Sequence, residues 1–182
     1  PRFFISQIDD ITQQVHAENA LKIRQRQLEA ANQQLDALAR TDSLTGLANR
    51  REFMNRLEQE LRRSQRNGQP LSVVVLDVDH FKEYNDTWGH PEGDLALKTV
   101  ADTLRDNARD MDLVVRHGGE EFALLLPETR GDQAREVAER IRVQVDSIRS
   151  LKQRISVSLG VKGFDPATDR RLQQAKPPIE AM

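Results

Sequence analysis

The chain has 182 residues, of which 37% are hydrophobic and 31% are charged, a length and apolar content typical of one packed domain with an extension. With 27 basic and 29 acidic residues the net charge is −2, so no strong field favours nucleic acid or an anionic membrane as the main partner. Cysteine is absent, which excludes a disulfide framework and Cys-based metal sites and is compatible with a reducing, cytoplasmic location.

The apolar runs of the sequence are short, and the chain carries neither a membrane-span pattern nor a signal-peptide pattern. We therefore expect no membrane contact within this segment. The chain begins with Pro1 rather than Met, which indicates a piece of a longer protein. A membrane anchor elsewhere in that protein is left open.

The N-terminal residues predict two elements. Residues 2–8 predict a short strand with no evident partner, and residues 12–40 lack Gly and Pro, which predicts a long helix. Apolar residues recur every seven positions in one seam, and a second seam is apolar at two of its three places; the six positions are Leu21, Leu28 and Leu35, then Arg24, Ala31 and Leu38. This pattern predicts a two-stranded coiled coil that makes a homodimer, the alternative being an amphipathic helix packed on its own domain.

After residue 41 strands alternate with helices. The predicted elements are a helix over 48–66, a strand over 71–78, helices over 81–86 and 93–108, a hairpin within 112–127, a helix over 132–149 and a strand over 155–161. The alternation with one intruding hairpin predicts an α/β (α+β) layer domain, in which helices flank a central mixed sheet.

Two aspartates stand at the end of the apolar strand. Asp77 and Asp79 share a face because side chains alternate along a strand, with Val78 opposite. Carboxylates in this place suit a hard cation such as Mg²⁺. The structural alternative is that Asp79 caps the following helix, whereas an Asp inside so apolar a strand as Asp77 needs another reason.

The hairpin "RHGGEEF" adds two more carboxylates. Gly118 and Gly119 suit a tight two-residue turn, and Glu120 and Glu121 then begin the return strand on opposite faces. If that strand pairs with residues 71–78, one glutamate lies beside Asp77 and the repulsion calls for a cation. Otherwise both glutamates are solvated charges on a sheet edge.

Other polar residues have both a structural and a binding interpretation. Lys82 begins a short helix and either grips a phosphate or is solvated. Asn85 and Asp94 can accept from purine N–H groups or form turns. Arg109 and Asp112, in "RDMD", are either a weak surface ion pair or a grip on a phosphate or base edge.

Four motifs in order resemble the diguanylate cyclase, or GGDEF, family. They are "DSLTGLANRREF" (42–53), "LDVDHFKEYNDTWGHPEGD" (76–94), "RHGGEEF" (116–122) and "ISVSLGV" (155–161). The resemblance implies a nucleotidyl-cyclase-like fold and condensation of two GTP, one on each of two facing domains, into cyclic di-3′,5′-GMP and two pyrophosphates.

The resemblance also implies roles for the motif residues. Asp77, the Val78 carbonyl, Glu120 and Glu121 would bind two Mg²⁺ ions, with Mn²⁺ as a substitute, and Glu120, Glu121 and Lys82 would serve catalysis. The remaining GTP contacts would come from the backbone at His80 and Phe81, with Lys82, on the phosphates, from Gly118 and Gly119 beside the nucleotide, and from Asn85 and Asp94 on guanine.

The same resemblance implies regulation. Arg109 and Asp112 match an inhibitory RxxD motif that binds the product cyclic di-GMP. Residues 1–11 resemble the tail of a PAS-like sensor, residues 12–40 a signalling and dimerisation helix, and residues 41–182 the cyclase domain. The chain departs from the family after the last strand, because "DRRLQQAKPPIEAM" replaces a helix that normally lends a lysine and an arginine to the triphosphate.

Two functions of different classes follow. The first is an active, product-inhibited cyclase controlled by an N-terminal sensor and coiled coil. The alternative is a catalytically silent domain that binds cyclic di-GMP or GTP as a receptor. The intact acidic and basic positions of the motifs favour the enzyme, since a receptor for product needs only Arg109 and Asp112.

Overall fold

A computed structural model describes residues 21–26 and 40–169 of the chain. The chain divides into two units at residues 39 and 40, and each is described by itself. Residues 21–26 are helical, in agreement with the long helix predicted over 12–40. The rest of that helix, the predicted strand at 2–8 and the atypical residues 170–182 lie outside the described residues.

The second unit contains a five-stranded sheet in the order β1-β3-β4-β2-β5. Only β1 runs parallel to its neighbour β3 among these strands, and the other pairs are antiparallel, which confirms the predicted mixed sheet. The elements are β1 (Ala48–Asn49), α2 (Arg50–Asn67), β2 (Leu71–Val78), α3 (Phe81–Trp88), α4 (His90–Asp106), β3 (Leu113–Gly118), β4 (Glu121–Pro127), α5 (Gly131–Asp146) and β5 (Val157–Phe164).

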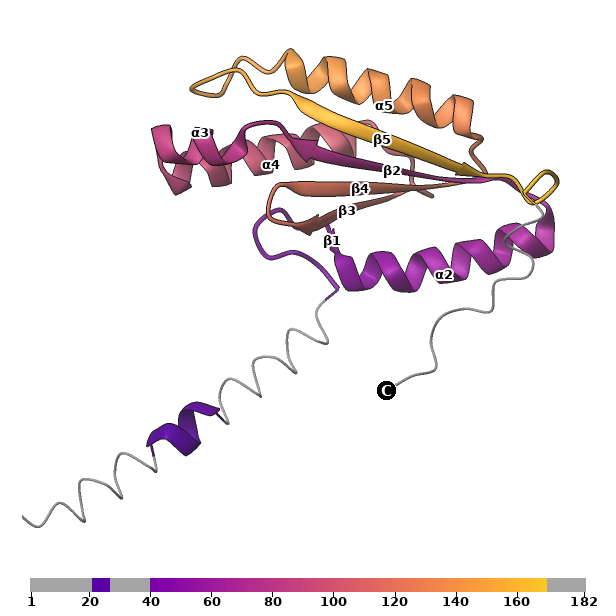
Figure 1. The fold of residues 1–182 in the computed structure, drawn as a ribbon, viewed down its shortest axis with the longest axis horizontal. Coiled ribbons are helices and arrows are strands. Elements are labelled where there is room, and N and C mark those ends of the chain that lie inside the picture. The colour runs from indigo at the N-terminus through magenta and orange to yellow at the C-terminus, as the bar shows by residue number, and fades with distance from the viewer. Residues whose placement is uncertain (1–20, 27–39, 170–182) are drawn as a thin grey trace, which may run out of the picture. The chain divides into compact units, whose positions relative to one another are not determined.

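Helices cover the sheet on both sides (Figure 1). Alternate residues of β2, such as Val74 and Leu76, are buried in a core cluster with α4 and α5. The intervening residues face α2, where Leu71 packs with Phe53 in a second cluster. This second face is covered less completely, since the Val75 side chain remains 52% exposed. No helix in the described part of the chain is both long and apolar enough to span a bilayer.

The predicted elements exist, with shifted ends. Asn49 caps α2 by accepting a hydrogen bond from the Glu52 N–H, so the helix begins two residues later than predicted and residues 48–49 form β1. The α4 helix begins at His90, three residues earlier than predicted. Pro91 lies in its first turn, where the missing N–H costs nothing.

Candidate active site

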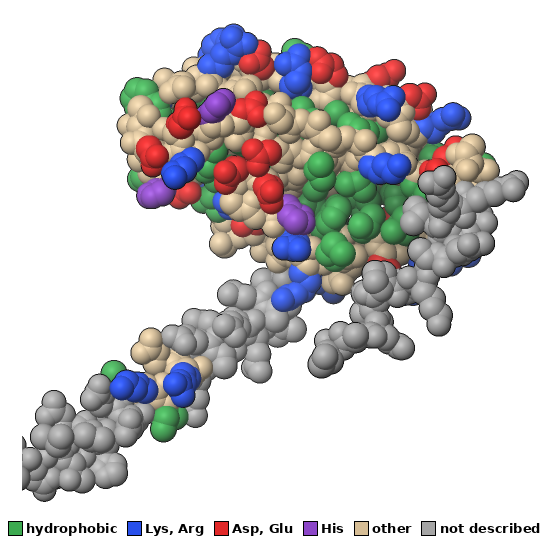
Figure 2. Space-filling view, viewed as in Figure 1, with side chains coloured by type: hydrophobic (Ala, Val, Ile, Leu, Met, Phe, Trp, Pro, Cys, Tyr) green, Lys and Arg blue, Asp and Glu red, His purple; other side chains and the backbone are tan. Residues whose placement is uncertain are grey.

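The acidic residues meet at one end of the sheet. Strand β2 pairs with β4 in a register that places Asp77 directly opposite Glu121. The Val78 N–H donates to the Glu120 carbonyl at 3.3 Å, which holds the hairpin turn against the end of β2. Acidic side chains gather on the face shown in Figure 2, next to an apolar surface. The predicted juxtaposition of Asp77 with one hairpin glutamate is confirmed.

Asp77 lies in an unfavourable electrostatic environment. Although the residue is exposed to solvent, partial desolvation raises the pKa of its carboxyl, and the neighbouring charges of Glu120, Glu121 and Asp79 raise it further. No hydrogen bond reaches the Asp77 carboxylate from any residue that the structure describes. Carboxylates arranged this way repel one another until a cation neutralises them.

Asp79 is held differently, although it is only two residues away. Its carboxylate accepts hydrogen bonds from the hydroxyls of Ser156 and Ser158, each at 2.6 Å, and these bonds lower its pKa. The cap position of α3 is occupied by His80, which makes no side-chain cap bond. The interpretation of Asp79 as a helix cap is therefore wrong. Its carboxylate is hydrogen-bonded instead to Ser158 of β5 and to Ser156, which directly precedes that strand.

The hairpin turn lies one residue later than predicted. Gly118 still belongs to β3, whereas Gly119 and Glu120 form the turn and β4 begins at Glu121. A register shift between Arg116 and Gly118 absorbs the extra residue. Gly119 has φ 52°, in the left-handed region that glycine adopts without strain. Glu120 therefore sits at the tip of the hairpin rather than on the return strand.

Side-chain hydrogen bonds of Arg116 hold this turn in place, and the sequence did not predict them. Arg116 donates from Nε and Nη2 to the Gly119 carbonyl at 2.9 and 2.8 Å. Its Nη1 reaches Asp42 at 3.1 Å, and Asp42 also accepts from the backbone and hydroxyl of Thr45. An acid 74 residues away from an arginine gives no local signal. Arg116 thus ties the loop after residue 40 to the acidic hairpin.

The candidate phosphate contacts lie just beyond β2. His80 has φ 56° and ψ 26°, a left-handed conformation that turns the chain into α3. Lys82 is exposed in the first turn of this helix, whereas Phe81 is buried and 8% exposed. Free N–H groups of a helix start and an exposed ammonium suit an anionic group. Lys82 thus lies four residues after the end of the strand that carries Asp77.

The candidate base contacts come from two adjacent helices. Asn85 belongs to α3 and Asp94 to α4, and Gly93 of α4 packs directly on the Asn85 side chain. The Asn85 Oδ1 atom is buried without a hydrogen-bond partner in the described structure, while Asp94 is exposed. The structure therefore brings the predicted base-reading pair into one neighbourhood.

The RxxD residues form a turn before β3. The Asp112 carboxylate accepts from the Arg109 N–H at 2.8 Å, and the Asp112 N–H donates to the Arg109 carbonyl at 3.0 Å. Burial raises the pKa of the Asp112 carboxyl, and its Oδ1 has no hydrogen-bond partner among the described residues. The surface ion pair considered as the structural alternative is absent from the described structure. The Arg109 side chain is exposed.

A cavity of about 450 Å³ opens beside the acidic residues at the end of β2. Its lining includes Asp77, Glu121 and the apolar Val75, together with His117 and Phe53. The His117 ring meets Phe53 edge-on at 6.2 Å, and its Nδ1 lies 3.6 Å from Glu121 Oε2. The sequence reasoning did not single out His117, whose only signal was its place next to the glycines.

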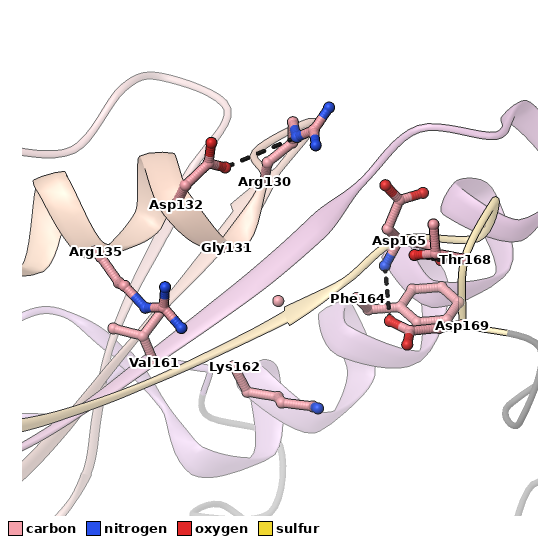
Figure 3. Close-up of a pocket in the computed structure, with 11 residues that line it drawn as sticks. Arg130, Gly131, Asp132, Arg135, Val161, Lys162, Phe164, Asp165, Thr168 and Asp169 are labelled. Carbon is pink, nitrogen blue, oxygen red and sulfur yellow. Dashed lines mark hydrogen bonds and ion pairs between the residues drawn. The ribbon is translucent and has the colours of Figure 1, made fainter.

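A second cavity, of about 460 Å³, lies at the start of α5 (Figure 3). Arg130 pairs there with Asp132 at 3.7 Å, and the Asp165 N–H donates to Asp169. Basic and acidic side chains both line this cavity, whereas the charged cluster at the end of β2 is acidic. The cavity also contains none of the predicted site residues.

The donor set at the C-terminal end of β2 fits a magnesium ion. Mg²⁺ takes oxygen ligands and usually only one or two protein carboxylates, with substrate phosphates and water completing its shell. Asp77 and the hairpin glutamates supply such oxygens, and their mutual repulsion favours a cation. In the described residues no three His, Cys, Asp or Glu side chains are gathered closely enough to hold a metal unaided. A metal that shares its ligands with a nucleotide is compatible with this arrangement.

A mixed sheet that gathers carboxylates at the end of β2, shortly before the start of α3, is suited to metal-dependent nucleotide chemistry. Residues 39–176 match the family described as "Diguanylate cyclase, GGDEF domain". The chain belongs to this family. The motif resemblance and the predicted fold class are thereby confirmed.

Individual relatives agree. The chain is 43% identical over 131 residues to the diguanylate cyclase DgcP of Pseudomonas aeruginosa, covering 70% of this chain and 20% of the relative. It is 40% identical over 141 residues to the diguanylate cyclase DosC of Escherichia coli, covering 74% and 31%. The chain thus spans less than a third of these relatives.

A solved structure extends the likeness to three dimensions. The chain resembles the GGDEF domain of DgcB from Caulobacter crescentus, crystallised in complex with c-di-GMP. The TM-score is 0.67 at 38% identity, over 71% of this chain and 80% of that one.

Proposed function

We propose that this protein is a diguanylate cyclase that condenses two GTP into cyclic di-3′,5′-GMP. The 3′-oxygen of each GTP bonds to the α-phosphorus of the other, and each bond to the leaving pyrophosphate breaks. Two pyrophosphates and the two hydroxyl protons are released. The observation that carries the proposal is the cluster of carboxylates at the C-terminal end of β2, where Asp77 lies opposite Glu121 and the pKa of Asp77 is raised.

The carboxylates would hold Mg²⁺, or Mn²⁺ in its place, two ions per site. Asp77, Glu120 and Glu121 supply side-chain oxygens and Val78 its carbonyl. When bound, the metal would neutralise the triphosphate and make the 3′-hydroxyl more acidic. Because Arg116 fixes the Gly119 carbonyl, the hairpin tip keeps its shape as the nucleotide binds.

The remaining residues would bind and orient GTP. Lys82 and the backbone at His80 and Phe81 take the terminal phosphates. Gly118 and Gly119 leave room beside the turn, since nothing lies within 4 Å of a Cβ built at either position.

Asn85 and Asp94 would read the base. A carboxylate at Asp94 accepts from guanine N1–H and N2–H, whereas adenine offers only a bare N1 acceptor at that edge. This difference favours GTP over ATP.

The reaction requires two sites that face each other, so we propose a homodimer joined through the helix of residues 12–40, downstream of a sensor tail at residues 1–11. Holding two substrates on two subunits makes the rate depend on dimer geometry. Linkers changed by steps other than seven residues should therefore change the activity, and unchanged activity would contradict this regulation.

We also propose that product restrains the enzyme through Arg109 and Asp112. Asp112 fixes the turn by accepting the Arg109 N–H, which leaves the exposed guanidinium available for a phosphate or a guanine edge. Loss of cyclic di-GMP binding in the Arg109→Ala variant, with turnover retained, would support this assignment.

The experiment that tests the function is incubation of the purified chain with GTP and Mg²⁺, with chromatographic detection of cyclic di-GMP and pyrophosphate. We expect one product molecule per two pyrophosphates and none with EDTA. Absence of turnover in a protein shown to be dimeric would refute the enzyme and leave the receptor function.

A further inference from the structure

The contact between α3 and α4 depends on a missing side chain. A Cβ built on Gly93 would lie 1.8 Å from Asn85 Oδ1, 2.9 Å from Asn85 Cγ and 3.2 Å from Phe81 Cζ. Real Cβ atoms essentially never lie within 3.0 Å of a non-bonded heavy atom, so something would have to shift. The Asn85 amide therefore occupies the volume that any other residue at position 93 would fill.

The backbone gives no separate reason for this glycine. Gly93 lies in the first turn of α4, its N–H donates to the Gly89 carbonyl at 3.2 Å, and its φ is not in the left-handed region. Alanine favours a helix over glycine. Local preference alone would therefore select alanine here, and close packing on Asn85 is what opposes it.

Among the described residues, the side-chain oxygen of Asn85 gains no hydrogen bond from its place. Its Oδ1 is buried against α4 with no partner in the described part of the chain, and Tyr84 and Phe81 of the same helix are also buried. An amide oriented at the cost of an unpaired oxygen is positioned by packing rather than by bonding. One amide atom faces Gly93, and the geometry of the amide directs the other away from it.

We propose that Gly93 is a positioning residue for nucleobase recognition, which orients Asn85 by leaving room for its amide. The proposal rests on the proposed function, since it specifies how the same site reads a purine. Asp94 follows Gly93 on α4, so one helix contact sets the spacing of both base-reading side chains. Any side chain at position 93 would push Asn85 toward the base and disturb this spacing.

The test is the Gly93→Ala variant of the full chain, titrated calorimetrically with GTP in the presence of Mg²⁺. We expect GTP affinity to fall at least about tenfold and the preference for GTP over ATP to shrink. In turnover assays, KM should rise with little change in kcat, because the candidate metal ligands at the end of β2 are unchanged. The melting temperature records whether folding is affected.

A matched control and a second variant make the result specific. Gly131→Ala makes the same change in the first turn of α5, where the new Cβ meets only an ordinary 3.5 Å contact, so GTP affinity should not change. In Asn85→Ala protein the clash with the Asn85 amide is removed and only the 3.2 Å approach to Phe81 Cζ remains, so adding Gly93→Ala should change affinity less than twofold.

Three outcomes overturn the proposal. One is unchanged GTP affinity in the single variant, and another is a tenfold loss that persists in the Asn85→Ala background. Equal loss in Gly131→Ala would also do so. Failure of the unmodified chain to bind GTP at all would instead contradict the proposed function, so the two failures are distinguishable.

Discussion

Two aspartates of this domain illustrate opposite uses of a carboxylate. Asp42 accepts from the Thr45 N–H, the Thr45 hydroxyl and Arg116. Burial raises the pKa of Asp42, but these bonds outweigh it and leave the pKa below its ordinary value. Asp77 is exposed but partly desolvated, has three neighbouring acids and accepts no hydrogen bond among the described residues, so its pKa is raised.

The opposite pKa shifts of Asp42 and Asp77 indicate a structural role for Asp42 and a candidate binding role for Asp77. The surroundings of Asp42 stabilise its charge, as expected of a residue that holds a loop to the hairpin. The surroundings of Asp77 disfavour its charged form, and a carboxylate whose pKa is raised by neighbouring acids is a candidate ligand for a cation. Asp79, bonded to two serines, belongs with Asp42 although it neighbours Asp77. The hydrogen bonds of a carboxylate therefore indicate its role better than its position in the sequence does.

The largest effect is expected for Asp77→Asn on activity. Removing a metal-ligand charge should lower cyclic di-GMP formation by about 100- to 1000-fold, a loss typical of removing one strong stabiliser of a charged transition state. Folding should be unharmed, because one of the mutually repelling charges disappears. Parallel turnover assays and thermal melts check this. A variant that keeps wild-type turnover would show that Asp77 is a solvated edge charge.

Asp42→Asn should behave in the opposite way. The variant loses the charge that pairs with the largely buried Arg116, whose side chain is only 13% exposed. We expect the free energy of unfolding to fall by about 1.5–3 kcal/mol, the usual value for a hydrogen bond to a charged group. Urea denaturation measures it, and Asp132→Asn, an exposed acid of α5, is the control. Equal free energies of unfolding for the two variants would contradict the prediction that Asp42 stabilises the hairpin through Arg116.

A smaller effect concerns acid pH. The lowered pKa of Asp42 contributes stability that is present above the ordinary value of 3.8 and is lost as pH falls through the folded-state pKa. The raised pKa of Asp77 acts in reverse, because its contribution is lost as pH rises through the folded-state value.

Melting curves recorded between about pH 2 and pH 6 separate the two aspartates. Asp42→Asn should weaken the loss of stability toward low pH, whereas Asp77→Asn should weaken the loss toward higher pH. Parallel curves for both variants and the unmodified chain would mean that neither carboxyl has a shifted pKa.

The sequence predicted much of the fold because its signals are local. The β-branched run of residues 71–78 forms β2 without a shift of either end, and the hairpin and the helices occur with ends shifted by a few residues. Two-residue β1 escaped prediction because it depends on pairing with β3. The start of α4 was misplaced because Pro91 was not recognised as a first-turn residue.

The candidate site was predictable where motif residues lie at a strand end or turn. Asp77 beside Glu121 followed from alternation and one assumed strand pairing, which the register confirms. The bonds of Arg116 to Asp42, the serines on Asp79 and the packing of Gly93 on Asn85 were not predictable. Each joins residues whose proximity depends on tertiary contacts that no short motif records.

The proposed function requires that the carboxylates at the C-terminal end of β2 bind GTP through a divalent cation. The most direct measurement is calorimetric titration of a non-hydrolysable GTP analogue into the unmodified chain and Asp77→Asn, each with Mg²⁺ and with EDTA. We predict binding by the unmodified chain that EDTA abolishes, and none above the EDTA level in the variant. Equal binding in all four titrations would contradict the account.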